Sequence, residues 1–258
     1  MKFILPLLFS LTLFANVIQT KIISVDNDTA TIKINNIQKG ISGVVVRHFT
    51  PKNSSIIASA SVEKFDKNTN TATLKLSKFT LFKNNNLPSG KWKPKVGDRV
   101  LLAFGYDRGL IIAPNEEIYY TLKRSMKNEV FIHPDVFTTF LSFKGHGTPL
   151  KEDFKGFCNN TTIGLLFFYI DQKLYTTDCQ TFKILNIQDA PLKQTSTQHP
   201  FYSRIKEIET NWFGKGKEKL TVYAPYYYKL LLKYNKDNQT LLQQSKKASK
   251  LKKEKSNG

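Results

Sequence analysis

The sequence predicts an α+β protein, in which a small β-rich N-terminal barrel or sandwich is followed by a helix pair, an antiparallel β-hairpin unit and a basic helical C-terminal tail. Three observations support this fold class. Short runs of alternating apolar and polar residues, separated by turn residues, fill residues 21–113. Helical periodicity and further strands share residues 114–233. After Leu242 the apolar residues nearly stop, so residues 234–258 are expected to form the basic tail.

The first 20 residues predict a secretory signal peptide. Lys2 gives a positively charged start, and residues 3–20 carry no charge, with Phe, Leu and Ile dominant as far as Ala15. A charged region followed by an apolar one is typical of an export signal. An uncleaved membrane anchor is the alternative, but polar residues dilute the apolar run. We therefore expect an exported protein, located in the periplasm, in the outer membrane or at the cell surface.

The β-rich part contains the same short pattern twice. Thr29 to Ile34 reads TATIKI, and Thr71 to Leu76 reads TATLKL. Each copy follows a turn and alternates polar with apolar side chains, so each predicts a strand with one buried face. The two copies indicate either a duplicated unit or two hairpins of similar pattern. Further short strands are predicted at 42–47, 56–65, 95–104 and 109–113.

Two short helices are predicted next. Asn115 is a suitable N-cap, and Glu116 and Glu117 follow at the positive end of the helix dipole. Pro134 suits the first turn of a second helix, for which His133 is a candidate cap. Apolar residues recur at helical spacing in both segments, so each helix is expected to bury one face.

A hairpin is predicted after the helix pair. The apolar run 162–170 predicts a buried strand, and Asp171 and Gln172 form a two-residue turn into a second strand at 173–177. The sequence then predicts a third strand at 182–187, a polar loop at 188–200, and a helix from Pro225 whose tyrosines at 226–228 are interpreted as packing residues.

The two cysteines, Cys158 and Cys179, are candidates for a disulfide, because an exported protein can oxidise them. The predicted hairpin register places Cys179 opposite Gly164 rather than Cys158. A bridge therefore requires the chain around Asn159 to fold back over the strand. Two free buried thiols are the alternative.

The chain is strongly basic. Lysine and arginine outnumber aspartate and glutamate by 39 to 20, which gives a formal net charge of +19. Such a field attracts lipid head groups, lipopolysaccharide, acidic proteins and nucleic acid. Export argues against nucleic acid in the cell and favours an anionic envelope surface. The candidate binding residues, for such a surface or for a lysine-binding protein, are the lysines of the tail, with a solvated tail as the alternative: Lys246, Lys247, Lys250, Lys252, Lys253 and Lys255.

The sequence offers little for catalysis. It contains no nucleophile elbow, phosphate-binding loop or dinucleotide fingerprint, and its four histidines lie at no recognised metal-ligand spacing. His146, which lies between two glycines and is interpreted as a solvated loop residue, and the polar loop 188–200 are the features that would suggest an enzyme. We therefore predict a non-enzymatic protein with no catalytic residues, no cofactor and no metal.

Several short segments together resemble a known family. They are Gly109–Tyr119, Phe137–Leu141, Ile163 with Gly164 after Cys158, Cys179–Leu185 and Pro200–Ile205. Their order and spacing, over most of the chain to about residue 233, resemble the N-terminal domain of the bacterial plasminogen-binding protein A family. The resemblance implies an envelope or cell-surface protein that binds host plasminogen. It also implies binding through lysines that kringle modules recognise, with a terminal lysine favoured.

The chain departs from the family pattern after this domain. Family members carry a long Lys/Glu-rich region and end in lysine, whereas this chain has a short basic tail and ends Ser256-Asn257-Gly258. The resemblance therefore supports the predicted domain and its cellular compartment better than it supports the plasminogen-binding activity. Two functions are expected: a surface protein that binds plasminogen through exposed lysines, or a periplasmic structural or assembly factor that contacts anionic envelope polymers.

Overall fold

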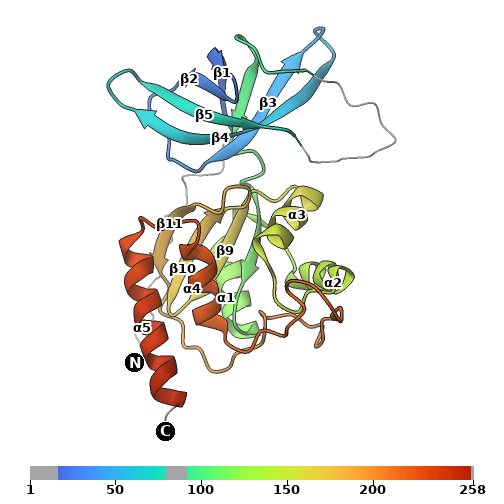
Figure 1. Cartoon of the computed structure of the whole chain (residues 1–258), viewed down its shortest axis with the longest axis vertical. Helices are drawn as coiled ribbons and strands as arrows, with labels where there is room; N and C mark the ends of the chain where they lie inside the picture. The colour runs from blue at the N-terminus through green and yellow to red at the C-terminus, as the bar shows by residue number, and fades with distance from the viewer. Residues whose placement is uncertain (1–16, 80–91, 257–258) are drawn as a thin grey trace.

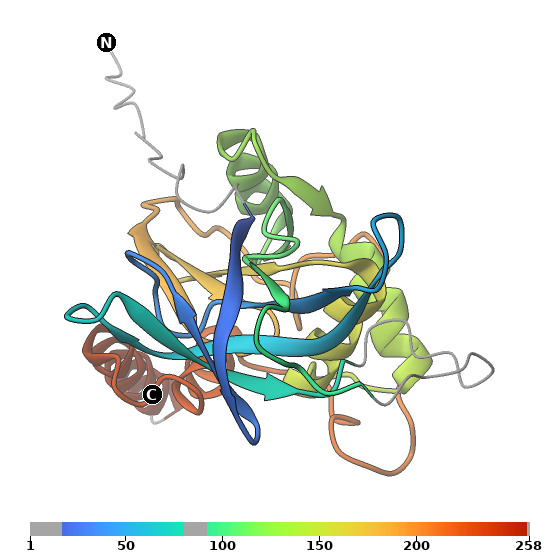
Figure 2. The ribbon, with the colours of Figure 1, turned by 90° about the horizontal axis from the view of Figure 1, so that it is seen from above.

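The computed structural model describes residues 17–79 and 92–256, with side chains as far as Ala248. A β-barrel lies on a second unit, built of a five-stranded sheet and helices (Figure 1). Seen from above, the barrel strands cross over the sheet of the second unit (Figure 2). This arrangement confirms the predicted α+β class and gives a barrel, rather than a sandwich, for the N-terminal part.

The barrel is closed and entirely antiparallel, with the strand order β1-β2-β5-β4-β3-β6. Closure pairs the first strand with the last, so no sheet edge is left open to another chain. The strands are β1 Ile18–Asp26, β2 Thr29–Lys33, β3 Ser42–His48, β4 Ser54–Asp66, β5 Thr71–Ser77 and β6 Arg99–Leu102.

The two copies of the repeated pattern are paired with each other. They form β2 and β5, which run antiparallel with Thr31 opposite Thr73 at the centre of the register. On the inner face Ala30 lies opposite Leu74, and Ile32 lies opposite Ala72. All four of these side chains are buried. Each small residue therefore faces a large one, which fills the barrel interior evenly.

The barrel begins earlier than the predicted export segment ends. Residues 1–16, which hold most of that segment, lie outside the described residues. Ile18 and Thr20, however, belong to β1 and pair with Leu102 and Val100 of β6. The predicted segment 1–20 therefore overlaps the first residues of β1, and its end at residue 20 stays a prediction.

The second sheet has the order β11-β10-β9-β7-β8. β7 runs parallel to β8 and β9, while β9, β10 and β11 form an antiparallel meander. The expected boundary at residue 113 thus falls one strand late, because β7 belongs to this sheet and not to the barrel. The strands are β7 Arg108–Ile112, β8 Val130–Ile132, β9 Leu165–Ile170, β10 Lys173–Asp178 and β11 Ile184–Asp189.

Helices cover both faces of the second sheet. Alternate residues of β7 and β9 point to opposite sides: Ile111 and Phe167 pack with α1, whereas Ile112 and Phe168 pack with the other helices. Both sides are buried, which explains the continuous apolar run in β9. The helices are α1 Glu116–Ser125, α2 Pro134–Lys144, α3 Lys151–Thr161, α4 Tyr223–Leu232 and α5 Gln239–Ser256.

The predicted helix caps and the predicted hairpin turn are confirmed. The Asn115 side chain accepts a hydrogen bond from the Ile118 amide at 2.9 Å, and the His133 ring accepts one from the Asp135 amide, so both caps are confirmed. The turn at Asp171 and Gln172 has positive φ at both residues, as a two-residue hairpin turn requires.

Replacing Asn115 with alanine is expected to lower the free energy of unfolding by about 1 kcal/mol, because the first turn of α1 loses its side-chain acceptor. Asn115→Asp keeps that acceptor and should lose clearly less. Urea denaturation followed by far-UV circular dichroism measures both. Equal losses for the two variants would show that the bond from the Asn115 amide to the Ser196 carbonyl, at 3.2 Å, matters instead.

The C-terminal basic segment is anchored rather than detached. It forms α5, which packs against α4, and its Leu241 is fully buried. Within α4, Tyr227 and Tyr228 are also fully buried, which confirms their interpretation as packing residues. None of the described helices is long and apolar enough to cross a membrane.

Candidate functional site

The junction between the barrel and the second unit centres on Asp178, at the end of β10. Its side chain is fully buried. One carboxylate oxygen accepts hydrogen bonds from the Ser42 amide at 3.0 Å, the Ser42 hydroxyl at 2.5 Å and the Tyr106 hydroxyl at 2.6 Å. The other accepts from the Gln180 and Thr181 amides at 2.9 and 2.7 Å. One carboxylate thus joins β3, the β6–β7 connection and the loop after β10.

The surroundings of Tyr106 keep its hydroxyl protonated, so that it donates a hydrogen bond. Burial, together with the Asp178 carboxylate, raises the pKa of Tyr106 well above its ordinary value. A second contact crosses the junction nearby: the Thr181 hydroxyl lies 2.7 Å from the Gly40 carbonyl. Gly40 has a φ of +96°, and an added Cβ would lie 2.3 Å from the Lys183 side chain. The junction therefore tolerates only glycine there.

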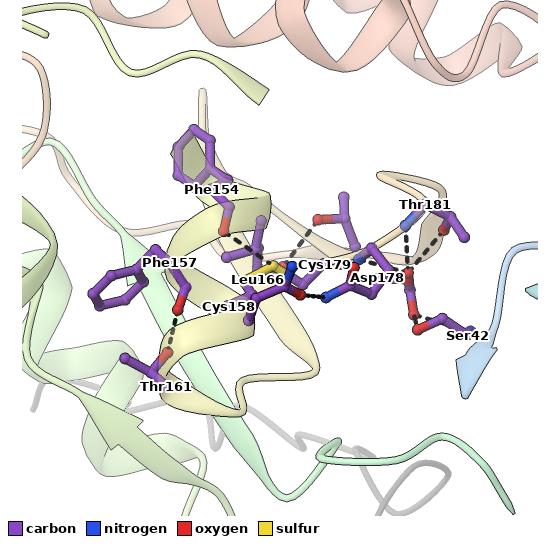
Figure 3. The surroundings of a disulfide bond; sticks show 12 residues. Ser42, Phe154, Phe157, Cys158, Thr161, Leu166, Asp178, Cys179 and Thr181 are labelled. Atoms are coloured by element: carbon purple, nitrogen blue, oxygen red, sulfur yellow. Dashed lines mark hydrogen bonds between the residues drawn. A yellow bond between two sulfur atoms is a disulfide. The ribbon is translucent and has the colours of Figure 1, made fainter. Parts of the chain in front are cut away.

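Cys158 and Cys179 form a disulfide beside the Asp178 cluster (Figure 3). Cys158 lies on α3, and Cys179 directly follows β10. The Cys179 amide donates to the Gly164 carbonyl at 2.9 Å, as the hairpin register predicted. The chain does fold back over the strand, but it does so as α3, a helix that the sequence analysis did not predict. Both cysteines are buried, so the bridge is shielded from solvent.

A groove with a volume of about 430 Å³ lies between the barrel and α3. The described residues of its lining include the lysines Lys75, Lys78, Lys151 and Lys155, and no aspartate or glutamate. The groove was not predicted from the sequence, because its lysines come from segments about 75 residues apart that only the tertiary fold brings together. The recurrence of lysine at residues 151 and 155 was the signal available.

The predicted binding lysines fall on α5. Lys246 and Lys247 are exposed, and among the described residues neither forms an ion pair. Lys250, Lys252, Lys253 and Lys255 lie further along the same helix, and their side chains lie beyond the described part. Buried Leu241 and Ala248 fix the other face of α5, so the exposed lysines stand on an anchored support.

His146 is not the solvated loop residue that the sequence suggested. Its ring nitrogen lies 2.9 Å from the carboxylate of Asp153, whose side chain is 5% exposed. The same carboxylate accepts a hydrogen bond from the Leu150 amide at 2.8 Å, at the start of α3. Asp153 therefore caps α3, and His146 binds the capping carboxylate. No group of three or more possible metal ligands occurs among the described residues.

Exposed aromatic side chains are a feature that was not predicted from the sequence. Phe143, Trp212 and Phe213 are each at least 85% exposed. The Asn211 amide donates to the Gly145 carbonyl at 3.0 Å, which holds the loop carrying Trp212 against the end of α2. The sequence pattern that could have indicated this feature is the adjacent pair Trp212 and Phe213 beside a stretch rich in glycine and lysine.

Comparison with known proteins identifies the family of the chain. The family model described as the plasminogen-binding protein pgbA N-terminal region matches residues 17–231. The chain belongs to this family. The match starts one residue before β1 and ends within α4, so it takes in the barrel and the whole second sheet. Helix α5, with the predicted binding lysines, lies beyond it.

Two curated relatives are similar over part of the chain. Both are called plasminogen-binding protein PgbA and come from Helicobacter pylori strains J99 and 26695. Each is 28% identical over 169 residues, which is 64% of this chain and 36% of the relative. The match therefore spans only about a third of the relatives' length. No solved structure matches the chain significantly.

Proposed function

We propose that this protein is an exported, non-enzymatic envelope or surface protein that binds plasminogen through exposed lysines, chiefly those of α5. Membership of the family and the name of the relatives support plasminogen as the partner. The net charge of +19 supports contact with a partner that recognises cations. The observation that carries the proposal is the exposure of Lys246 and Lys247 on a helix whose opposite face is packed.

The geometry of α5 suits recognition by a lysine-binding pocket. A lysine ammonium is a compact charge on a flexible four-carbon stem, so it can enter a pocket without moving its backbone. Among the described residues, Lys246 and Lys247 have no ion pair to break when they bind, which removes one cost of association. The anchored helix limits the conformational entropy that docking would cost.

Replacing the six α5 lysines with glutamine is expected to weaken plasminogen binding at least about tenfold, because each change removes the ammonium and keeps a helix-forming side chain. Surface plasmon resonance with plasminogen and its isolated kringle modules measures the affinity. A lysine analogue such as 6-aminohexanoic acid should compete with the wild-type protein. The matched control changes six exposed barrel lysines to glutamine: Lys21, Lys33, Lys39, Lys52, Lys64 and Lys67.

The control separates specific recognition from general charge. Binding that falls only in the α5 variant, and that the analogue competes, supports the proposal. Equal losses in both variants, smooth weakening with salt and no effect of the analogue would instead favour the second candidate, a factor that contacts anionic envelope polymers through its basic surface. Protease treatment of intact cells tests the location, because a strictly periplasmic protein could not capture a host protein.

A further inference from the structure

The groove between the barrel and α3 has a defined floor and a defined opposite wall. Its floor is the outer face of β3, β4 and β5, and its opposite wall is α3 with the residues after β10. The floor is polar because β4 alternates: Ala58, Ala60 and Val62 fill the barrel, while Ser59 and Ser61 point outward.

The floor residues are also small, which leaves the space open. Ser59 pairs with Ser77 of β5, and Ser61 pairs with Ser42 on one side and Lys75 on the other. Within the described part of the chain, the hydroxyls of Ser59, Ser61 and Ser77 form no hydrogen bond, whereas the Ser42 hydroxyl donates to Asp178. Three hydroxyls are therefore free to bind a ligand.

Positive charge surrounds this floor. Lys75 and Lys78 enter from the barrel side, and Lys151 and Lys155, one helical turn apart, enter from α3. Burial, followed by the nearby Lys155 ammonium, lowers the pKa of Lys151. The Lys151 ammonium rests 3.7 Å from the centre of the Tyr234 ring, which holds it in place. An anion in the groove would relieve the repulsion between the Lys151 and Lys155 ammonium groups.

The remaining lining favours a sugar over a planar ring system. Among the described residues, Phe104 is the one aromatic side chain in the lining, so this part of the chain offers a single stacking surface. The lining also contains two side-chain amides. The Gln180 amide donates a hydrogen bond to the side-chain oxygen of Asn159 at 2.6 Å, which fixes the orientation of both side chains. A volume of about 430 Å³ falls within the usual range for a small-molecule site.

From these observations we propose that the groove binds a carbohydrate that carries an oxyanion group, either phosphate or carboxylate. The lysines neutralise the oxyanion, and the serine hydroxyls and the two amides bind the sugar hydroxyls. The disulfide preorganises the site, because Cys158 lies in its wall and Cys179 immediately precedes Gln180. The site is separate from α5 and does not depend on plasminogen binding.

Isothermal titration calorimetry with N-acetylglucosamine 6-phosphate, glucuronic acid, N-acetylglucosamine and inorganic phosphate tests the proposal. The anionic sugars should bind at least about tenfold more tightly than the neutral sugar and than phosphate alone. A second titration uses a delipidated, phosphorylated core oligosaccharide. Tighter binding to this oligosaccharide than to the monosaccharides would identify a polymer as the natural ligand. Tighter binding to the monosaccharides would identify a free metabolite.

Variants locate the site. Lys75→Glu with Lys155→Glu should weaken binding of the anionic sugars at least about tenfold. Lys33→Glu with Lys64→Glu makes the same charge change on exposed barrel positions and should leave binding within about twofold. Circular dichroism checks that both variants fold. The proposal is overturned if no anionic sugar binds better than phosphate, or if both pairs of changes weaken binding equally. Plasminogen binding of the groove variant should equal that of the control variant.

Discussion

Replacing Asp178 with alanine is expected to lower the free energy of unfolding by about 4 kcal/mol, because the change leaves several buried donors without an acceptor. The amides of Ser42, Gln180 and Thr181 and the hydroxyl of Tyr106 all point at the carboxylate. Since these groups belong to both units, the loss should also loosen the junction. Urea unfolding monitored by tryptophan fluorescence and by circular dichroism measures both effects, and the two signals should cease to coincide.

Two controls define the origin of that loss. Asp178→Asn keeps the shape but presents an amide group to donors, so it should cost about 2 kcal/mol or more. Asp189→Ala removes the partner of Lys173, but its side chain is 81% exposed, so the change should cost less than about 1 kcal/mol. An Asp178→Ala protein that unfolds like the wild type would show that the junction contributes little to stability.

Loss of the disulfide is expected to lower the free energy of unfolding by about 3 kcal/mol, because the bridge closes a loop with a sequence separation of 21 residues. The suitable variant replaces both Cys158 and Cys179 with alanine, which avoids burying a free thiol or an added hydroxyl. Urea denaturation with and without a reducing agent measures the effect. The reductant should destabilise the wild type and leave the variant unchanged.

The reduced wild type provides the internal control for this prediction. Once the bridge is broken, its unfolding midpoint should approach that of the double alanine variant. A wild-type midpoint that is insensitive to reductant, under conditions in which free-thiol titration confirms reduction, would contradict the prediction. Sugar binding in the groove should weaken in parallel, because α3 then loses its tie to the loop that carries Gln180.

Local features of the fold could be predicted from the sequence because neighbouring residues determine them. The Asp171–Gln172 turn fixes the β9–β10 register and hence the position of Cys179 opposite Gly164. Asn115 defines the start of α1 in the same way. In each case a turn or cap residue and a hydrophobic period act over fewer than 20 residues.

Features that depend on distant residues could not be predicted. The apolar run of β7 looks like one more barrel strand, and only its parallel pairing with β9 places it in the second sheet. Helix α3 buries Phe154, Phe157 and Cys158, but Gly156 and the polar residues after Cys158 weaken its helical pattern. One wall of the groove is α3, which was not predicted, so the lysines of the groove could not be grouped in advance.

The pairing of β1 with β6 sets an order of events during synthesis. Because the chain is made from its N-terminus, Ile18 becomes available more than 80 residues before its partner Leu102. Until then β1 can pair only with β2, and its other edge stays open. Barrel closure must therefore follow a long loop closure, which is slow and leaves the nascent strand accessible in the meantime.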